Sequence, residues 1–447
     1  MRTIIKNATI VNEGRTFKGS VVIENNLIEK VIEGTAENLK VEDAEIINAE
    51  GKYLFPGVID DQVHFREPGL THKGDIYSES KAAVAGGITS FMEMPNTVPN
   101  ATTIDILEEK YKIASEKSFG NYSFYMGATN DNIDELRKID NSNVCGIKTF
   151  MGSSTGNMLV DKLESLQQIF ALNSLIAVHC EDENTIKENL RKQKEIYGEN
   201  IPVSMHPVIR NAEACMKSSS FAVELAKQNN TRLHILHLST ADEMDLLTNT
   251  IPLAEKKITS EVCVHHLWFS DEDYNEKGVL IKWNPAIKSA NDRAALWEAL
   301  DNGKLDIVAT DHAPHTIEEK NKTYLNAPSG GPLVQHSLIA MLEFFHQGKI
   351  SPENIVNKMC HAPAVCFKVS KRGFIRPGYY ADLVLVDLNS PWKVNKSNIL
   401  SKCKWSPFEG TIFQSQITHT FVNGYPVYRN GIFDETQKGM RLQFERE

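Results

Sequence analysis

The chain has 447 residues, of which 41% are hydrophobic and 24% are charged, so it can bury the core of one large domain and one small domain. The net charge of -10 and the lack of a Lys/Arg run argue against nucleic acid as a partner. Without a long apolar segment or a secretory signal pattern, we expect no membrane association. Seven cysteines without a CxxC pair fit neither a disulfide framework nor a cysteine-rich zinc site, and favour a reducing cytoplasm.

Both ends of the chain carry the same β pattern. Residues 3–11 and 19–32 alternate polar and apolar side chains around an Asn-rich turn, and residues 381–388 and 419–428 do so near the C-terminus. We therefore expect the ends, residues 1–54 and 369–447, to form one small β-sandwich domain.

The middle of the chain alternates short apolar strands with helical segments such as residues 77–87 and 215–228. Eight strands are predicted, at residues 57–65, 88–95, 121–127, 144–150, 174–180, 231–239, 258–266 and 305–312. This count and alternation predict an α/β fold, a (β/α)8 TIM barrel, over residues 55–368.

Six of these strands end in, or just before, a chemically capable residue. The six residues are His64, Asn96, Lys148, His179, His237 and Asp311. Because active sites of such barrels lie at the carboxyl ends of the strands, the six side chains are expected to meet. Imidazole and carboxylate ligands that converge from several strands indicate a zinc-type catalytic site, although each residue alone has a structural explanation.

Lys148 is expected to point into the barrel mouth beside metal cations, where an ammonium would be repelled. Burial and neighbouring cations lower the pKa of a lysine, and its neutral amine can then react with carbon dioxide to give a carbamate. The carbamate is an anion able to bridge two metals. The alternative is a lysine that extends to solvent.

The segment "TDHAPHT" places Asp311 close to His315, and Asp311 can act as both a ligand and a proton carrier. The role of His312 is open. The remaining histidines His72, His206, His234, His336 and His346 are interpreted as structural or exposed. His234 lies three residues before His237, so strand alternation predicts that it faces the opposite side of the sheet.

These residues belong to a longer series of motifs: "DDQVHFREPG", "AAVAGGITSFMEMPNT", "GIKTF", "VHCED", "HILHLST", "EVCVHHLWFS", "KWNPAIKSANDRAALWEAL", "ATDHAPHTIEEK", "APSGGP" and "HAPA". In this order they resemble the dihydroorotases of the amidohydrolase superfamily, and with "GYYADLVLVD" the resemblance covers almost the whole chain. Fold analogy alone would not carry a function, so the residues are matched one by one.

The resemblance implies one or two zinc ions held by an HxH pair on the first strand, a carboxylated lysine, histidines after strands five and six, and an aspartate after strand eight. His64, Lys148, His179, His237 and Asp311 match these positions. The first histidine of HxH is replaced by Gln62, whose neutral amide oxygen is a weaker zinc ligand, so the first metal is expected to be held less tightly.

The implied reaction is the reversible hydrolysis of dihydroorotate to carbamoyl-aspartate, with Asp311 as the proton carrier. Arg66 and Asn96 are expected to bind the substrate carboxylate, together with His315. The loop at Ala327, Pro328 and Gly330 is expected to present backbone groups to the ring, and Thr155 is expected to contact the substrate from the loop after Lys148. The alternative for Arg66 is an ion pair with Glu67 or another neighbour.

Two other functions stay open. Hydantoinases and allantoinases share the barrel and the metals, but their substrates carry no ring carboxylate, so Arg66 and Asn96 favour dihydroorotate. A non-catalytic partner of aspartate transcarbamoylase is favoured only by Gln62. We also expect a homo-oligomer, such as a dimer, with aspartate transcarbamoylase as a candidate partner.

Overall fold

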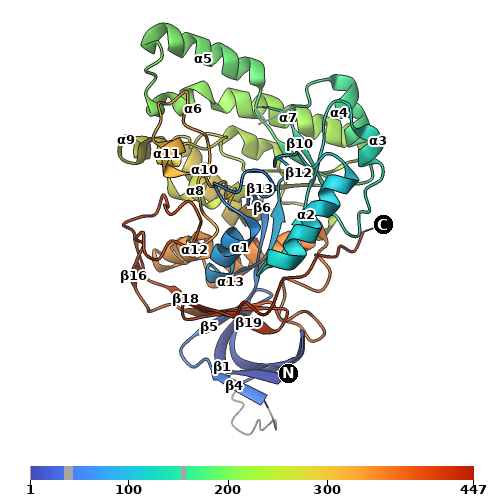
Figure 1. Ribbon diagram of the computed structural model, residues 1–447, viewed down its shortest axis with the longest axis vertical. Coiled ribbons are helices and arrows are strands. Elements are labelled where there is room, and N and C mark those ends of the chain that lie inside the picture. Colours follow the sequence, from blue (N-terminus) through green and yellow to red (C-terminus); the bar gives the residue numbers. More distant parts are fainter. Residues whose placement is uncertain (1, 35–43, 153–157, 447) are drawn as a thin grey trace.

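The centre of the molecule is a barrel of parallel strands. The computed structural model describes residues 2–34, 44–152 and 158–446 (Figure 1). The barrel strands are β6 (Val58–Val63), β7 (Ile88–Glu93), β8 (Asn121–Phe124) with its short continuation β9 (Met126–Gly127), β10 (Ile147–Phe150), β11 (Leu175–His179), β12 (Arg232–Ile235), β13 (Ile258–Cys263) and β14 (Ile307–Ala309). They lie within the eight segments predicted from the sequence, and the (β/α)8 barrel is confirmed.

Hydrogen bonds connect neighbouring strands around the barrel. β6, β7 and β8 form one parallel ladder, and β9 to β14 form a second in chain order. The ladders meet at Tyr125, whose N–H donates to Glu93 at 3.0 Å, while the next residue donates to Gly146 at 3.1 Å. On the other side, the N–H of His64 donates to the carbonyl of His312 at 2.7 Å. All eight strands therefore direct their carboxyl ends to one face.

Helices surround the barrel, and several begin at a side-chain cap. Asp75 accepts the N–H of Ser78 at 2.7 Å at the start of the first helix, and Asn211 accepts the N–H of Ala214 at 3.0 Å. None of the described helices is long and apolar enough to cross a membrane. The helices are α1 (Ile76–Ala85), α2 (Ile104–Lys117), α3 (Ile133–Leu136), α4 (Leu163–Phe170), α5 (Glu183–Tyr197), α6 (His206–Ile209), α7 (Ala212–Asn229), α8 (Val264–Trp268), α9 (Tyr274–Lys277), α10 (Ala290–Asp301), α11 (Ile317–Lys320), α12 (Ser337–His346), α13 (Pro352–Val356) and α14 (Ala362–Phe367). The 3-10 helices are η1 (Val203–Met205), η2 (Asp242–Leu246), η3 (Leu253–Glu255), η4 (Asp271–Asp273) and η5 (Gly278–Ile281), and η6 (Asn357–His361) is a π-helix.

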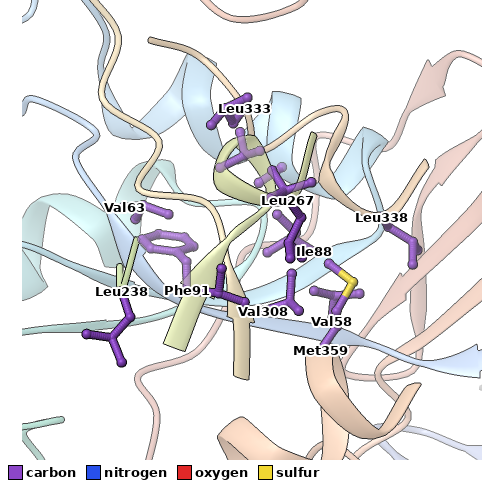
Figure 2. Close-up of a cluster of buried hydrophobic side chains, with 14 of the residues drawn as sticks. Val58, Val63, Ile88, Phe91, Leu238, Leu267, Val308, Leu333, Leu338 and Met359 are labelled. Atoms are coloured by element: carbon purple, nitrogen blue, oxygen red, sulfur yellow. The ribbon is translucent and has the colours of Figure 1, made fainter. Parts of the chain in front are cut away.

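A continuous apolar core lies between the strands and the helices. Figure 2 shows one part of it, where side chains from β6, β7 and β14 meet others from α8, α12 and η6. The labelled residues are Val58, Val63, Ile88, Phe91, Leu238, Leu267, Val308, Leu333, Leu338 and Met359, all of them buried. Burial of such side chains contributes about 1.5–3 kcal/mol each and holds the strand ends at fixed positions.

Strands from both chain ends form one nine-stranded sheet among the described residues, at the end of the molecule away from α5 (Figure 1). The two predicted groups of strands join where β5 pairs with β1 on one side and β15 on the other, so the union of the chain ends is confirmed. The strands are β1 (Arg2–Asn12), β2 (Arg15–Glu24), β3 (Leu27–Glu33), β4 (Ala44–Asn48), β5 (Tyr53–Pro56), β15 (Leu383–Asp387), β18 (Gln416–Val422), β19 (Tyr425–Arg429) and β20 (Ile432–Phe433); the pair β16 (Trp392–Lys393) and β17 (Ile412–Phe413) is separate.

Gly57 is the single residue between β5 of the sheet and β6 of the barrel. A side chain could not be accommodated there, because a Cβ atom would lie 2.0 Å from Oγ1 of Thr89. The sheet is therefore attached at the start of β6, and the opposite, carboxyl face of the barrel is left to the loops that form the site.

Candidate active site

A pocket of about 210 Å³ opens at the carboxyl ends of the barrel strands. It brings together eleven of the thirteen site residues predicted from the sequence. Its lining consists of Gln62, His64, Arg66, Asn96, Lys148, Phe150, His179, His237, Trp283, Asn284, Asp311, Ala313, His315, Pro328, Ser329 and Gly330. A small pocket with convergent polar groups suits a small polar ligand.

His179 and His237 direct ring nitrogens at one point. His179 is the last residue of β11, and its Nδ1 lies 2.9 Å from Nε2 of His237. The other nitrogen of His179, Nε2, lies 3.0 Å from Oε2 of Glu181, which also pairs with Arg210. Burial holds the pKa of both histidines below the usual value, so neutral imidazoles with free lone pairs are favoured.

His64 and Asp311 form the second pair. His64 Nε2 lies 3.2 Å from Oδ1 of Asp311, and its Nδ1 lies 2.7 Å from Oδ1 of Asn96. Asn96 therefore orients His64. Gln62 donates its Nε2 to the same Oδ1 of Asp311 at 3.2 Å, and its Oε1 lies 3.8 Å from the Cys263 thiol.

Lys148 lies between these pairs on β10 and is 1% exposed, which excludes a side chain that extends to solvent. Its Nζ lies 4.6 Å from the centre of the Phe150 ring. Burial lowers the pKa of Lys148 to about 7, although Asp311 and Glu261 oppose the change. A large fraction of this amine is neutral at physiological pH, the state that carboxylation requires.

The donor set fits the zinc ions that the sequence predicts. Imidazole nitrogens and carboxylate oxygens are zinc ligands, and these come from opposite sides of one pocket. The buried Nδ1 of His237 has no hydrogen-bond partner within residues 2–34, 44–152 and 158–446. A set of neutral imidazoles whose facing nitrogens, Nδ1 of His179 and Nε2 of His237, lie 2.9 Å apart is consistent with ligands arranged for a cation.

Arg66 and His315 form another part of the pocket lining. Arg66 donates Nε to the carbonyl of Pro314 at 3.1 Å, and its Nη2 lies 3.1 Å from Nε2 of His315. The alternative pairing with Glu67 is absent from the described residues, because Glu67 pairs with Lys117. Burial lowers the pKa of Arg66 to about 10, so the guanidinium stays charged.

The loop "APSGGP" contributes Pro328 and Gly330 to the pocket, whereas Ala327 is buried beside it and does not line it. Gly330 has a φ of +119°, and a Cβ atom there would lie 2.7 Å from the carbonyl oxygen of Ala313. This position therefore requires glycine. Thr155 lies outside the described residues.

Three of the site residues adopt the left-handed backbone conformation, which residues other than glycine rarely adopt. The φ angles are +73° at Arg66, +40° at His237 and +47° at Asp311. Such backbone strain, of order 1–3 kcal/mol per residue, concentrates at functional sites. Each residue follows the end of a barrel strand, so the chain turns sharply where it places the side chain over the pocket.

His234 faces the barrel interior. Strand alternation had predicted that it would face the other side of the sheet, and that prediction is wrong. Its Nε2 lies 3.1 Å from Oδ2 of Asp61 and 3.4 Å from Oε2 of Glu261, and all three side chains are fully buried. The reason is that β12 ends at Ile235, and the left-handed turn at His237 breaks the alternation. Both histidines therefore face inward.

Sequence reasoning missed several pocket residues. Trp283 and Asn284 line the pocket, and the buried Oδ1 of Asn284 has no hydrogen-bond partner in the described part of the chain. The available signal was their position beside Pro285 in the motif "KWNPAIK". Glu181 was also missed, although an acidic residue two positions after a ligand histidine can hold that histidine in place. His312 is structural, since its Nε2 lies 2.9 Å from Glu79.

Comparisons with known proteins show the family to which the chain belongs. Residues 53–427 match the amidohydrolase family. A dihydroorotase of Methanosarcina acetivorans is 32% identical over 91% of this chain and 88% of its own, and an L-hydantoinase of Paenarthrobacter aurescens is 30% identical over 96% and 94%. The solved L-hydantoinase of Arthrobacter aurescens is 28% identical over 97% of both chains, with a TM-score of 0.90. The family match covers most of the chain, and the chain belongs to the amidohydrolase family.

Proposed function

We propose that this protein is a dihydroorotase, which catalyses the reversible hydrolysis of (S)-dihydroorotate to N-carbamoyl-L-aspartate in pyrimidine (UMP) biosynthesis. The observation that carries the proposal is the position of Arg66. Its buried guanidinium faces the same small pocket as Lys148, His179, His237 and Asp311. A buried cation in the same pocket as the reacting groups is the feature that a ring with a carboxylate requires and a neutral ring does not.

Zinc would be held by His64, Lys148, His179, His237 and Asp311. Lys148 would bind as a carbamate, and Gln62 would be a weak ligand at the first position. Bound zinc supplies Lewis acidity toward the amide carbonyl and lowers the pKa of water. Glu181 and Asn96 hold the rings of His179 and His64 in fixed orientations, through contacts of 3.0 Å and 2.7 Å.

Asp311 is the proton carrier of the proposed reaction. Water adds to the carbonyl carbon of the ring amide, the C–N bond of the ring breaks, and Asp311 passes a proton from the water to the departing nitrogen. Cyclisation reverses these steps. The side chain of Asp311 is 9% exposed, and it is oriented by the contacts of 3.2 Å from His64 and Gln62.

Arg66, Asn96 and His315 bind the ring carboxylate. Burial, with Arg66 and Lys73 nearby, holds the pKa of His315 far below its usual value, so this ring is neutral. His315 can then accept a hydrogen bond from Arg66 and hold the guanidinium in the pocket. Pro328 and Gly330 close the side of the pocket next to it, and Thr155 and Ala327 stay proposed contacts.

We further propose the division into residues 1–54, 55–368 and 369–447, a cytoplasmic location and a homo-oligomer such as a dimer. Aspartate transcarbamoylase is the candidate partner. The domain bounds are supported by the β pattern of the chain ends and the location by the cysteine content, whereas the oligomer and the partner follow from the family resemblance.

A hydantoinase is the second candidate, because the chain is similar to L-hydantoinases in sequence and in fold. Purified protein should be assayed with dihydroorotate, carbamoyl-aspartate, dihydrouracil and hydantoin, and its zinc content measured. The proposal requires dihydroorotate to have the highest kcat/KM. Faster hydrolysis of the uncharged rings would establish the hydantoinase, and the absence of all activity from zinc-loaded protein would favour the non-catalytic partner.

A further inference from the structure

Two buried lysines hold the pocket loop through its carbonyl oxygens. Lys320, at the end of α11, is fully buried, and its Nζ donates to the carbonyls of Gly330 at 2.8 Å, Pro328 at 3.0 Å and Lys282 at 3.4 Å. Pro328 and Gly330 are both pocket residues. The N–H of Gly330 also donates to the carbonyl of Lys282 at 2.8 Å, so the loop is fixed from two directions.

The side chain of Lys282 holds the beginning of the same loop. Its Nζ donates to the carbonyl of Ala327 at 2.6 Å and to that of Tyr324 at 2.7 Å. Lys282 directly precedes Trp283 and Asn284, which line the pocket. Within residues 2–34, 44–152 and 158–446, neither Lys282 nor Lys320 forms a salt bridge with a carboxylate.

A buried ammonium without a carboxylate is unfavourable, because carbonyl dipoles replace only part of its hydration. Burial lowers the pKa of Lys282 to about 8, which leaves most of this group charged at pH 7. Burial, with Lys282 nearby, lowers the pKa of Lys320 well below its usual value. Three carbonyl oxygens surround its Nζ, and only an ammonium has three N–H donors to match them.

The positive charge lies on one side of the pocket. Arg66 and Lys73 contact His315 there, at 3.1 Å and 3.2 Å, and Lys320 lies behind Gly330 next to them. Three acids act on Arg66: Asp311, which belongs to the proposed metal-binding groups, Glu93, which pairs with Lys110 at 2.7 Å, and Glu319, which pairs with Lys73 at 3.2 Å. In a low-dielectric environment such an excess of cations attracts an anion and gives a neutral ligand little advantage.

We propose that Lys282 and Lys320 are specificity-determining positioning residues, which fix the loop Ala327–Gly330 and make this side of the pocket select a ring that bears a carboxylate. The inference rests on the proposed function and extends it, because it assigns substrate selection to two residues that do not line the pocket. Neither lysine belongs to the metal-binding or proton-carrying groups.

The test compares dihydroorotate with dihydrouracil, which has the same ring without the carboxylate. Lys320→Met and Lys282→Met remove both the charge and the donors, and Lys282→Gln removes the charge but retains N–H donors. Lys358→Met is the matched control, since Lys358 is also buried and donates to a carbonyl, that of Leu305 at 2.6 Å, outside the pocket. Folding is followed by circular dichroism and melting temperature.

We expect kcat/KM for dihydroorotate relative to dihydrouracil to fall about tenfold or more in the three pocket variants, which corresponds to about 1.4 kcal/mol, mainly through KM for dihydroorotate. The ratio should not change in Lys358→Met. An equal loss with both substrates, or an unchanged ratio in folded Lys282→Gln, would overturn the inference and leave the dihydroorotase proposal intact. A wild-type preference for dihydrouracil would overturn both.

Discussion

Glu261 accepts the main-chain N–H of His237 at 2.9 Å, through a carboxylate that is fully buried beneath the active site. This contact anchors the residue whose φ of +40° turns the chain at the end of β12. The second oxygen of Glu261 faces His234, which also contacts Asp61. A set of three side chains below the pocket thus holds the backbone of a candidate metal ligand.

Glu261→Leu should weaken zinc binding about 10 to 100-fold, because His237 loses the acceptor that fixes its backbone. The measurement is a zinc titration of the metal-free protein monitored by calorimetry. Glu261→Gln retains an oxygen at this position and should lose much less zinc affinity. Equal zinc affinity in folded Glu261→Leu would show that the contact does not position His237.

Lys148→Ala should abolish hydrolysis and lower the zinc content, because the proposed carbamate ligand would be removed. A short carboxylic acid such as propionate should restore part of both by occupying the space of the lost side chain. Mass spectrometry of the intact wild-type protein under non-denaturing conditions should show the added mass of one carbon dioxide. Full activity of Lys148→Ala without any added acid would refute the carbamate.

Gln62→His should increase the zinc retained after mild chelation, with affinity at the first site raised about 10 to 100-fold. Wild-type protein should hold one zinc firmly and the other weakly, since Gln62 presents its N–H group to Asp311. Metal content during stepwise dialysis against a chelator measures this. Two zinc ions of equal retention in the wild type would mean that Gln62 turns its amide and binds well.

Arg66→Lys should raise KM for dihydroorotate about tenfold with little change in kcat, since a lysine keeps the charge but cannot form the two parallel bonds. Arg66→Ala should bind dihydroorotate more weakly still, and its kcat/KM for dihydroorotate should approach its kcat/KM for dihydrouracil. Steady-state kinetics with both substrates gives the answer. Normal KM values for Arg66→Ala would remove Arg66 from the substrate site.

Stability should fall at alkaline pH through His234. Burial alone would lower the pKa of His234, but the hydrogen bonds of Asp61 and Glu261 raise it to about 9. The folded state holds this proton more tightly than the unfolded chain does. The stabilisation is therefore complete below about pH 6.5 and is lost as the pH rises through about 9. The stabilisation amounts to about 3 kcal/mol. The melting temperature of the wild type should fall between pH 7 and 9.5 more than that of His234→Gln. Parallel pH profiles would contradict the raised pKa.

The barrel and the residues at its mouth could be predicted because the evidence for them is local in sequence. Strand periodicity and the residue at each strand end place His64, Lys148, His179 and Asp311 correctly, and these residues meet in one pocket. Position within a parallel barrel strand determines which face a side chain reaches, so motif and geometry agree there.

Features that depend on backbone turns or on distant partners could not be predicted. The inward position of His234 follows from the left-handed turn at His237, and strand alternation does not predict such a turn. Asn284 and Trp283 reach the pocket from the loop before α10, and the clamp of Lys320 on Gly330 exists only after the loop has folded. Such contacts depend on how the loops after different strands pack together.

The left-handed conformations of Arg66, His237 and Asp311 have a consequence for directed evolution toward heat resistance. Glycine at these positions removes the backbone strain, and asparagine tolerates the conformation better than arginine or histidine does. A selection for thermostability alone would therefore enrich such replacements at the very residues that carry the chemistry. The backbone strain at these residues lowers the free energy of unfolding, and the active site depends on it. Libraries screened for stability should therefore leave these three residues unchanged.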